Sequence, residues 1–151
     1  MLYNLLKFIH VVSIAVWFGG MVTMLILNRL LIGAGDAAAA QSIGRQGRGL
    51  SSRLFLPAVA VTLITGVGMV QVNDIGFGTL WIVWGMVGLF VSLYIGAVLT
   101  GGTARKLAEQ AARGEIDGAG IARVQRRIML YALVNTLLLL TTIWAMVAKP
   151  S

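Results

Sequence analysis

The apolar stretch "LLKFIHVVSIAVWFGGMV", residues 5–22, decides the fold of this chain. It has the character of a membrane-spanning helix, which needs about 20 apolar residues to cross roughly 30 Å of hydrocarbon. It also contains His10, the only histidine of the chain. An ionisable side chain in hydrocarbon is costly and normally faces other helices, a partner or a water-filled cavity. The stretch therefore predicts a spanning helix and makes His10 the first candidate for a functional residue.

The composition of the whole chain agrees with a membrane protein. Of its 151 residues, 58% are hydrophobic and only 11% are charged, whereas roughly 25% are charged in a soluble domain. Apolar runs lie at about 4–32, 54–72, 79–100 and 128–148. The first run lacks a basic start and a small-x-small cleavage site, so we interpret it as a mature helix. We expect an all-α bundle of four transmembrane helices, one domain over residues 1–151, in the inner (plasma) membrane.

The basic residues predict the orientation of this bundle. Ten of the twelve Lys and Arg residues lie in or beside the two long linkers, 33–53 and 101–127, and none lies in the short connection "VNDIGFG", residues 72–78. The positive-inside rule then places both long linkers in the cytoplasm and both termini outside. The net charge of +7 is explained by anionic lipid head groups, without any nucleic acid.

Local signals predict how the linkers and spans are built. Asp36 is a candidate N-cap before an alanine run. Glu109 precedes Arg113 by four residues on a helix that extends out of the third span, and "GEIDGAG" breaks that helix. Pro57 falls in the first turns of the second span, where its missing N–H matters least.

The third span carries small residues three or four apart, a spacing that lets helix backbones approach closely. They are Gly85, Gly88, Ser92 and Gly96. We interpret them as a packing face, with a groove for a flat ligand as the alternative. Tyr131 and Asn135 on the fourth span lie too near the cytoplasmic end to reach His10, and we expect them to form hydrogen bonds between helices.

Nearly all polar residues of the first span share one face at 100° per residue. The residues of this face are Lys7, His10, Ser13, Trp17, Gly20, Met24 and Asn28. We expect this face to meet the other helices. His10 then either bonds a hydroxyl or carbonyl of a neighbouring helix, or ligates a metal or haem, because neutral imidazole is the commonest metal ligand. Thr65, Met69, Trp84, Gly85 and Gly88 lie at a similar depth.

The opening stretch resembles the first helix of a superfamily of small membrane proteins. This superfamily includes the copper-resistance protein D family, the HemJ-type membrane protoporphyrinogen oxidases and an uncharacterised four-span family. The shared pattern is an early histidine followed by a tryptophan and glycines, here His10, Trp17, Gly19 and Gly20. "RLFLPAVAVTLITGVGMV" is similar to the second helix of these proteins, and "GFGTLWIVWGMVGLF" most resembles the uncharacterised branch.

By analogy with the oxidases, the resemblance implies haem b held by His10. Trp17 and Trp84 could flank the macrocycle, and Gly85 and Gly88 could line it. The third span departs from the oxidases because it has no lysine or histidine before Arg105. The haem would then be five-coordinate, take Met69 as a second ligand, or be shared by two copies of His10 in a homodimer.

Other functions remain open beside electron transfer or haem handling with a redox partner. His10, Met69 and Met86 could hold Cu(I), which prefers imidazole and thioether ligands, and the chain could be a copper transporter or a non-catalytic membrane subunit. If the protein is an enzyme, we expect a membrane oxidoreductase. The sequence has no cysteine, no paired carboxylates within a span, no Ser-His-acid set and no phosphate loop, which argues against hydrolysis and nucleotide chemistry.

Overall fold

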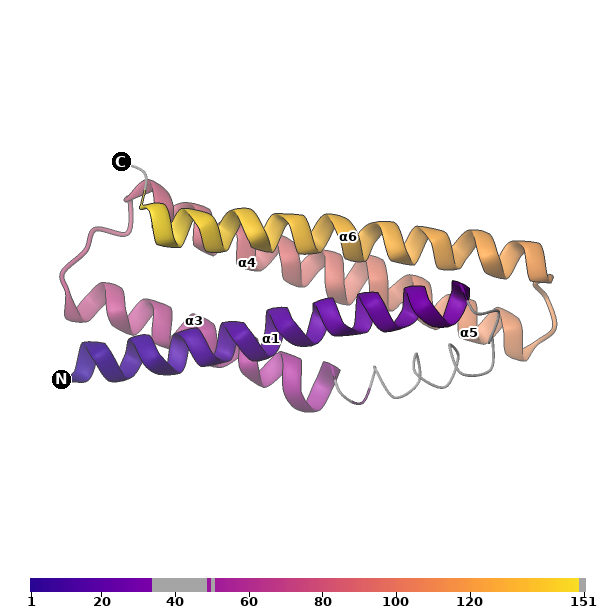
Figure 1. Ribbon diagram of the computed structural model, residues 1–151, viewed down its shortest axis with the longest axis horizontal. Coiled ribbons are helices and arrows are strands. Elements are labelled where there is room, and N and C mark those ends of the chain that lie inside the picture. The colour runs from indigo at the N-terminus through magenta and orange to yellow at the C-terminus, as the bar shows by residue number, and fades with distance from the viewer. Residues whose placement is uncertain (34–48, 50, 150–151) are drawn as a thin grey trace. The chain divides into compact units, whose positions relative to one another are not determined.

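The computed structural model describes residues 1–33, 49 and 51–149, and most of these residues form helices. Asp36 lies outside the described residues. The helices follow in the order α1 (Leu2–Gly33), η1 (Ser51–Phe55), α3 (Leu56–Val72), α4 (Leu80–Tyr94), η2 (Ile95–Gly101), α5 (Gly102–Ala112) and α6 (Gly118–Ala148) (Figure 1).

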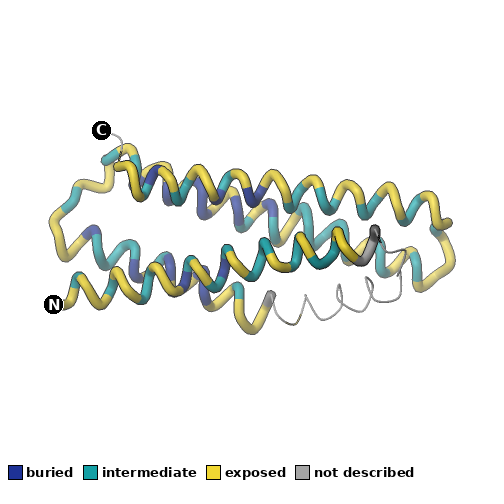
Figure 2. Tube along the Cα trace, in the orientation of Figure 1, coloured by how far each residue is buried: buried dark blue, intermediate teal, exposed yellow. Residues whose placement is uncertain are grey.

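Within the described residues, four helical stretches are long and apolar enough to cross a membrane, which confirms the predicted four-span architecture. They are Leu2–Leu30, Ser52–Val72, Leu80–Ala112 and Gly118–Ala148. Exposed residues run along the whole length of each of them (Figure 2), and many are large and apolar, such as Phe8, Ile64 and Phe90. In water such surfaces would be costly, but in a bilayer they meet lipid tails.

The chain divides into two compact units, of which the first contains α1, η1 and α3. α1 and α3 lie side by side (Figure 1). Leu6 lies against Gly68, His10 against Thr62 and Gly20 against Phe55. Because residue numbers rise along α1 as they fall along α3, the two helices are antiparallel.

The start of α3 shows the effect of its proline. Pro57 lies in the first turn of α3, as the sequence predicts, and a wider π-helical turn, η1, comes directly before it. Phe55 has helical φ and ψ angles, so the helix continues from η1 into α3. A proline ring cannot donate to the carbonyl four residues earlier and pushes it away, which accounts for the widening of the turn.

The second unit comprises Trp84–Lys149 and contains most of α4 together with η2, α5 and α6. The third span continues as a helix from Leu80 to Ala112, which confirms the predicted extension into the linker. α6 begins at Gly118, where the Asp117 carboxylate caps the helix by accepting a hydrogen bond of 2.8 Å from the Gly120 N–H. The break predicted at "GEIDGAG" is therefore present, and the fourth helix begins before the apolar run that starts at about residue 128.

The spacing of four residues between Glu109 and Arg113 does not lead to an ion pair between them. Glu109 instead lies 3.7 Å from Arg105, one turn earlier on α5, and Arg113 lies 3.8 Å from Glu115. Arg113 is the residue directly after α5, and its guanidinium lies beside Glu115 in the connection to α6.

The small residues of the third span form a packing face against α6. A Cβ added at Gly85 would collide with the Met146 side chain, and one at Gly88 would collide with Thr142. Ser92 is only 2% exposed. A Cβ at Gly96 would lie 3.9 Å from the Asn135 amide nitrogen. Close approach of α4, η2 and α6 thus depends on these positions having little or no side chain.

Candidate functional site

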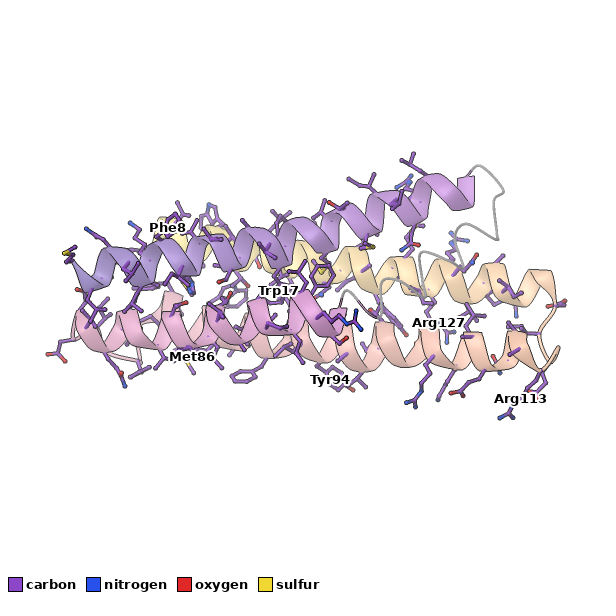
Figure 3. All side chains as sticks on the ribbon, turned by 90° about the horizontal axis from the view of Figure 1, so that it is seen from below. Phe8, Trp17, Met86, Tyr94, Arg113 and Arg127 are labelled. Atoms are coloured by element: carbon purple, nitrogen blue, oxygen red, sulfur yellow. The ribbon has the colours of Figure 1, made fainter. Side chains whose placement is uncertain are left out.

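The polar face of α1 meets α3 at His10 and η1 at Gly20. Ser13 and Trp17 are buried, and His10, Gly20, Met24 and Asn28 are half-buried. Lys7, at the end of the row, is exposed, and so are Phe8 and Val11 on the opposite side. Figure 3 shows Phe8 pointing away from the pair, whereas Trp17 points toward it. The predicted direction of the polar face is confirmed at His10 and Gly20.

His10 is held by α3 through one ring nitrogen. Its Nδ1 lies 2.9 Å from the Thr62 carbonyl oxygen and 3.0 Å from the Thr65 hydroxyl oxygen. Thr65 is buried, and His10 beside it is half-buried. The imidazole therefore joins two spans that are separated in the sequence by about fifty residues.

The partners of Nδ1 fix which ring nitrogen carries the proton. A carbonyl oxygen can only accept, so Nδ1 donates to Thr62. The Thr65 hydroxyl donates to the Val61 carbonyl at 2.6 Å, which leaves its oxygen free to accept from Nδ1 as well. In the neutral ring, Nε2 then has a lone pair. Among the described residues, Nε2 has no hydrogen-bond partner.

A glycine of α3 allows the ring to come this close. A Cβ added at Gly66 would lie 3.2 Å from Cε1 of His10 and 3.6 Å from its Nδ1. The tighter of these distances is below an ordinary van der Waals contact, so a side chain at this position would displace the ring. Of the two neighbouring glycines in α1, Gly20 has the same role, because the Phe55 ring occupies the place of its Cβ, whereas Gly19 faces open space.

The remaining predicted ligand residues of the first unit are Trp17 and Met69. Trp17 is buried on α1, two turns beyond His10. Met69 is half-buried on α3 and follows Thr62, Thr65 and Gly66 at helical spacing, so it shares their face. Within the described part of the chain, no group of three or more His, Asp or Glu side chains gathers as in a metal centre.

The other predicted site residues belong to the second unit. Trp84 is 46% exposed. Gly85 and Gly88 are buried against α6 side chains. Met86, considered as a copper ligand, is half-buried (Figure 3). In this unit Gly85 and Gly88 therefore allow α4 to pack closely against α6.

Sequence reasoning placed Thr65 at the depth of His10 but missed Thr62 and Phe55. Thr62 acts through its main-chain carbonyl, which residue identity does not reveal. Its side chain gives an indirect signal, because threonine hydroxyls in spanning helices bond the carbonyl one turn earlier, as Thr62 does with Ala58 at 2.8 Å. Phe55 could have been found as the large residue one turn before Ala58 on the same face.

Comparison with protein families identifies the chain at the level of its architecture. Residues 4–150 match the model of the family described as a predicted integral membrane protein, DUF2269. The match covers nearly the whole chain, which therefore belongs to this family of multi-pass integral membrane proteins. No curated protein and no solved structure matches the chain.

Proposed function

We propose that this member of the DUF2269 integral membrane family binds haem b through Nε2 of His10, in electron transfer or in haem handling. The observation that carries the proposal is the hydrogen bond of 2.9 Å from Nδ1 of His10 to the Thr62 carbonyl oxygen. It directs the proton of a neutral imidazole to Nδ1 and leaves the lone pair on Nε2.

This arrangement is the one that ligating histidines usually have. Their second nitrogen almost always donates to a carbonyl, carboxylate or water, which fixes the tautomer, orients the ring and raises the basicity of the ligating nitrogen. The same hydrogen bond also joins α1 to α3. Here the Thr62 carbonyl, the Thr65 hydroxyl and the space above Gly66 together hold the ring in one orientation.

The donor set fits a haem, and the resemblance of the opening stretch to the HemJ-type oxidases supports this group over others. His10 would supply the axial nitrogen, and Trp17 is an aromatic side chain of the same helix face. When bound, haem b supplies one-electron transfer between ferric and ferrous iron. The role of the protein chain would be to hold the ligand nitrogen and to exclude water from it.

Three forms of the proposal differ in which residue would provide a second ligand for the haem. Met69 follows the His10 contacts on the same face of α3, so it is the candidate ligand within one chain. Two copies of His10 in a homodimer would share one haem between two chains. A five-coordinate haem would use His10 alone. The ratio of haem to chain and the effect of Met69→Leu distinguish these forms.

Copper binding is the second candidate, and the shared face of Met69 and the His10 contacts favours it. A thioether and an imidazole are suitable ligands for Cu(I). The same Nδ1 hydrogen bond would orient the imidazole for copper. Transport of copper or a role as a metal-binding membrane subunit would follow, instead of electron transfer.

The test is the absorption spectrum of the protein purified in mild detergent, without a polyhistidine tag, from cells supplied with haem. We expect a Soret band that disappears in His10→Gln, because this variant lacks the ligand nitrogen. Glutamine can still donate to the Thr62 carbonyl, so the variant keeps the helix contact but removes the imidazole. Ser13→Ala is the matched control, since that hydroxyl bonds only the Ile9 carbonyl of its own helix.

Three results would overturn the haem proposal. One is a wild-type protein without haem from haem-supplied cells, and another is a Soret band retained in His10→Gln. The third is stoichiometric copper, measured by elemental analysis, that is lost in His10→Gln and in Met69→Leu. That last result would establish the copper alternative.

A further inference from the structure

We propose that the hairpin formed by α5 and the start of α6 binds the phosphate groups of anionic phospholipids through four cations. The four, here called the basic belt, are Lys106, Arg123, Arg126 and Arg127. All four are exposed. The proposal concerns the second unit and does not depend on His10 or on a haem.

The acidic residues of the hairpin do not neutralise the belt. Glu109 lies 3.7 Å from Arg105, and Glu115 lies 3.8 Å from Arg113. The Asp117 carboxylate accepts the Gly120 N–H at the start of α6. Within the described residues, no ion pair involves a cation of the basic belt.

The belt residues lie at similar heights along the hairpin. α5 ends at Ala112 and α6 begins at Gly118. At 1.5 Å per residue, Lys106 lies about 9 Å before the end of α5. The three arginines, Arg123 to Arg127, lie about 8 to 14 Å after the start of α6. Figure 3 shows Arg113 at the turn and Arg127 farther along, toward the apolar part of α6. The two helices thus bring four cations into one band, while Glu115 and Asp117 stay near the turn.

The apolar part of α6 places this band at the height of lipid head groups. Residues 128–148 carry no charge and span about 32 Å, which matches the roughly 30 Å of hydrocarbon. Arg126 and Arg127 come directly before this segment. Lys106 and Arg123 then stand within about 10 Å of the hydrocarbon boundary, in the layer that contains the phosphates.

The chemistry of the belt suits lipid phosphates. An arginine guanidinium donates two parallel hydrogen bonds to phosphate oxygens, and lysine adds a point charge. Each basic residue at an anionic membrane surface contributes about 1 kcal/mol, equivalent to about fivefold in affinity. A soluble acidic partner would need these cations to stand clear of the membrane, whereas their position beside the apolar segment keeps them in the head-group layer.

The test measures which lipids stay bound to the purified chain in mixed micelles of phosphatidylglycerol and phosphatidylcholine, by native mass spectrometry. We expect a preference for phosphatidylglycerol that falls about fivefold for each belt residue changed to glutamine and disappears in the variant with all four changes. Raising the salt concentration should weaken the preference, because the belt is exposed. Arg113→Gln is the matched control, as that arginine lies at the turn and pairs with Glu115.

Micelles present both ends of the spans to lipid, so a change of membrane orientation in the variant does not affect the result. The melting temperature of each variant shows whether the fold is kept. Equal retention of the two lipids by the wild type would overturn the proposal, and so would an unchanged preference in the fourfold variant. Displacement of phosphatidylglycerol by soluble glycerol phosphate at equal concentration would instead assign the belt to free anions.

Discussion

At the scale of single residues, two threonines one turn apart on α3 contribute differently to the His10 contact. Thr62 offers its carbonyl to Nδ1, and its hydroxyl bonds Ala58 of its own helix. Thr65 offers its hydroxyl oxygen to Nδ1. Only the side chain of Thr65 therefore takes part in the link between the two helices.

This difference predicts unequal effects of the same substitution. Thr65→Val should lower the free energy of unfolding in detergent by about 1 kcal/mol, the usual strength of a hydrogen bond between spanning helices. Thr62→Val should leave it nearly unchanged, because its carbonyl stays in place. Thermal or denaturant unfolding of the two variants measures the effect, and an equal loss in both would contradict the geometry described for Nδ1.

The sequence predicted the direction of His10 because the polar residues of the first span share one face. It also predicted the depth of Thr65, because antiparallel spans of known ends fix the heights of their residues. It did not predict the Thr62 carbonyl or the fit of the ring over Gly66. Both depend on the distance between two backbones, which the pattern of side chains does not contain.

At the scale of the elements, glycines of the third span stand in opposite environments. Gly88 is buried, and an added Cβ would strike the Thr142 side chain of α6. Gly102 has no atom within 4 Å of an added Cβ. The same residue type thus permits close packing in α4 and only adds backbone freedom in α5.

Substitution by alanine should separate these two roles. Gly88→Ala should destabilise the protein by about 1 to 3 kcal/mol, the usual result of overpacking. Gly102→Ala should stabilise it by up to about 1 kcal/mol, because alanine is the better helix former. Melting temperatures of both variants under one detergent condition test this, and a stable Gly88→Ala would show that α4 and α6 are not closely packed there.

Element types were easier to predict than their ends and pairings. Long apolar runs fixed the four spans, and "GEIDGAG" fixed the break before α6. The spacing of Glu109 and Arg113 did not lead to an ion pair, because both side chains are exposed and each lies beside another partner of opposite charge. The π-helical turns at Ser51–Phe55 and Ile95–Gly101 have no distinct hydrophobic period and could not be predicted.

At the scale of the whole molecule, the distribution of charge predicts the orientation in the membrane. The positive-inside rule places the turn between α5 and α6 in the cytoplasm, and the connection between α3 and α4 outside. The chain has no cysteine, so single cysteines can be introduced as the only reactive thiols.

Gly76→Cys should react with a membrane-impermeant maleimide in intact cells, because Gly76 is exposed in the outer connection. Ala119→Cys, exposed near the start of α6, should react only after the membrane is opened. The labelling pattern of the two variants reports the orientation directly. The reverse pattern would show that the basic linkers face outward.

The most direct test of the central claim is a nitrogen NMR spectrum of the detergent-solubilised protein with isotope-labelled histidine. The chain has one histidine, so the two ring nitrogens can be assigned without ambiguity if no histidine tag is present. We expect a protonated Nδ1 in haem-free and haem-bound protein, and an Nε2 resonance that changes strongly when haem binds. A proton on Nε2 in the haem-free protein, or an Nε2 resonance unaffected by haem, would contradict the role assigned to His10.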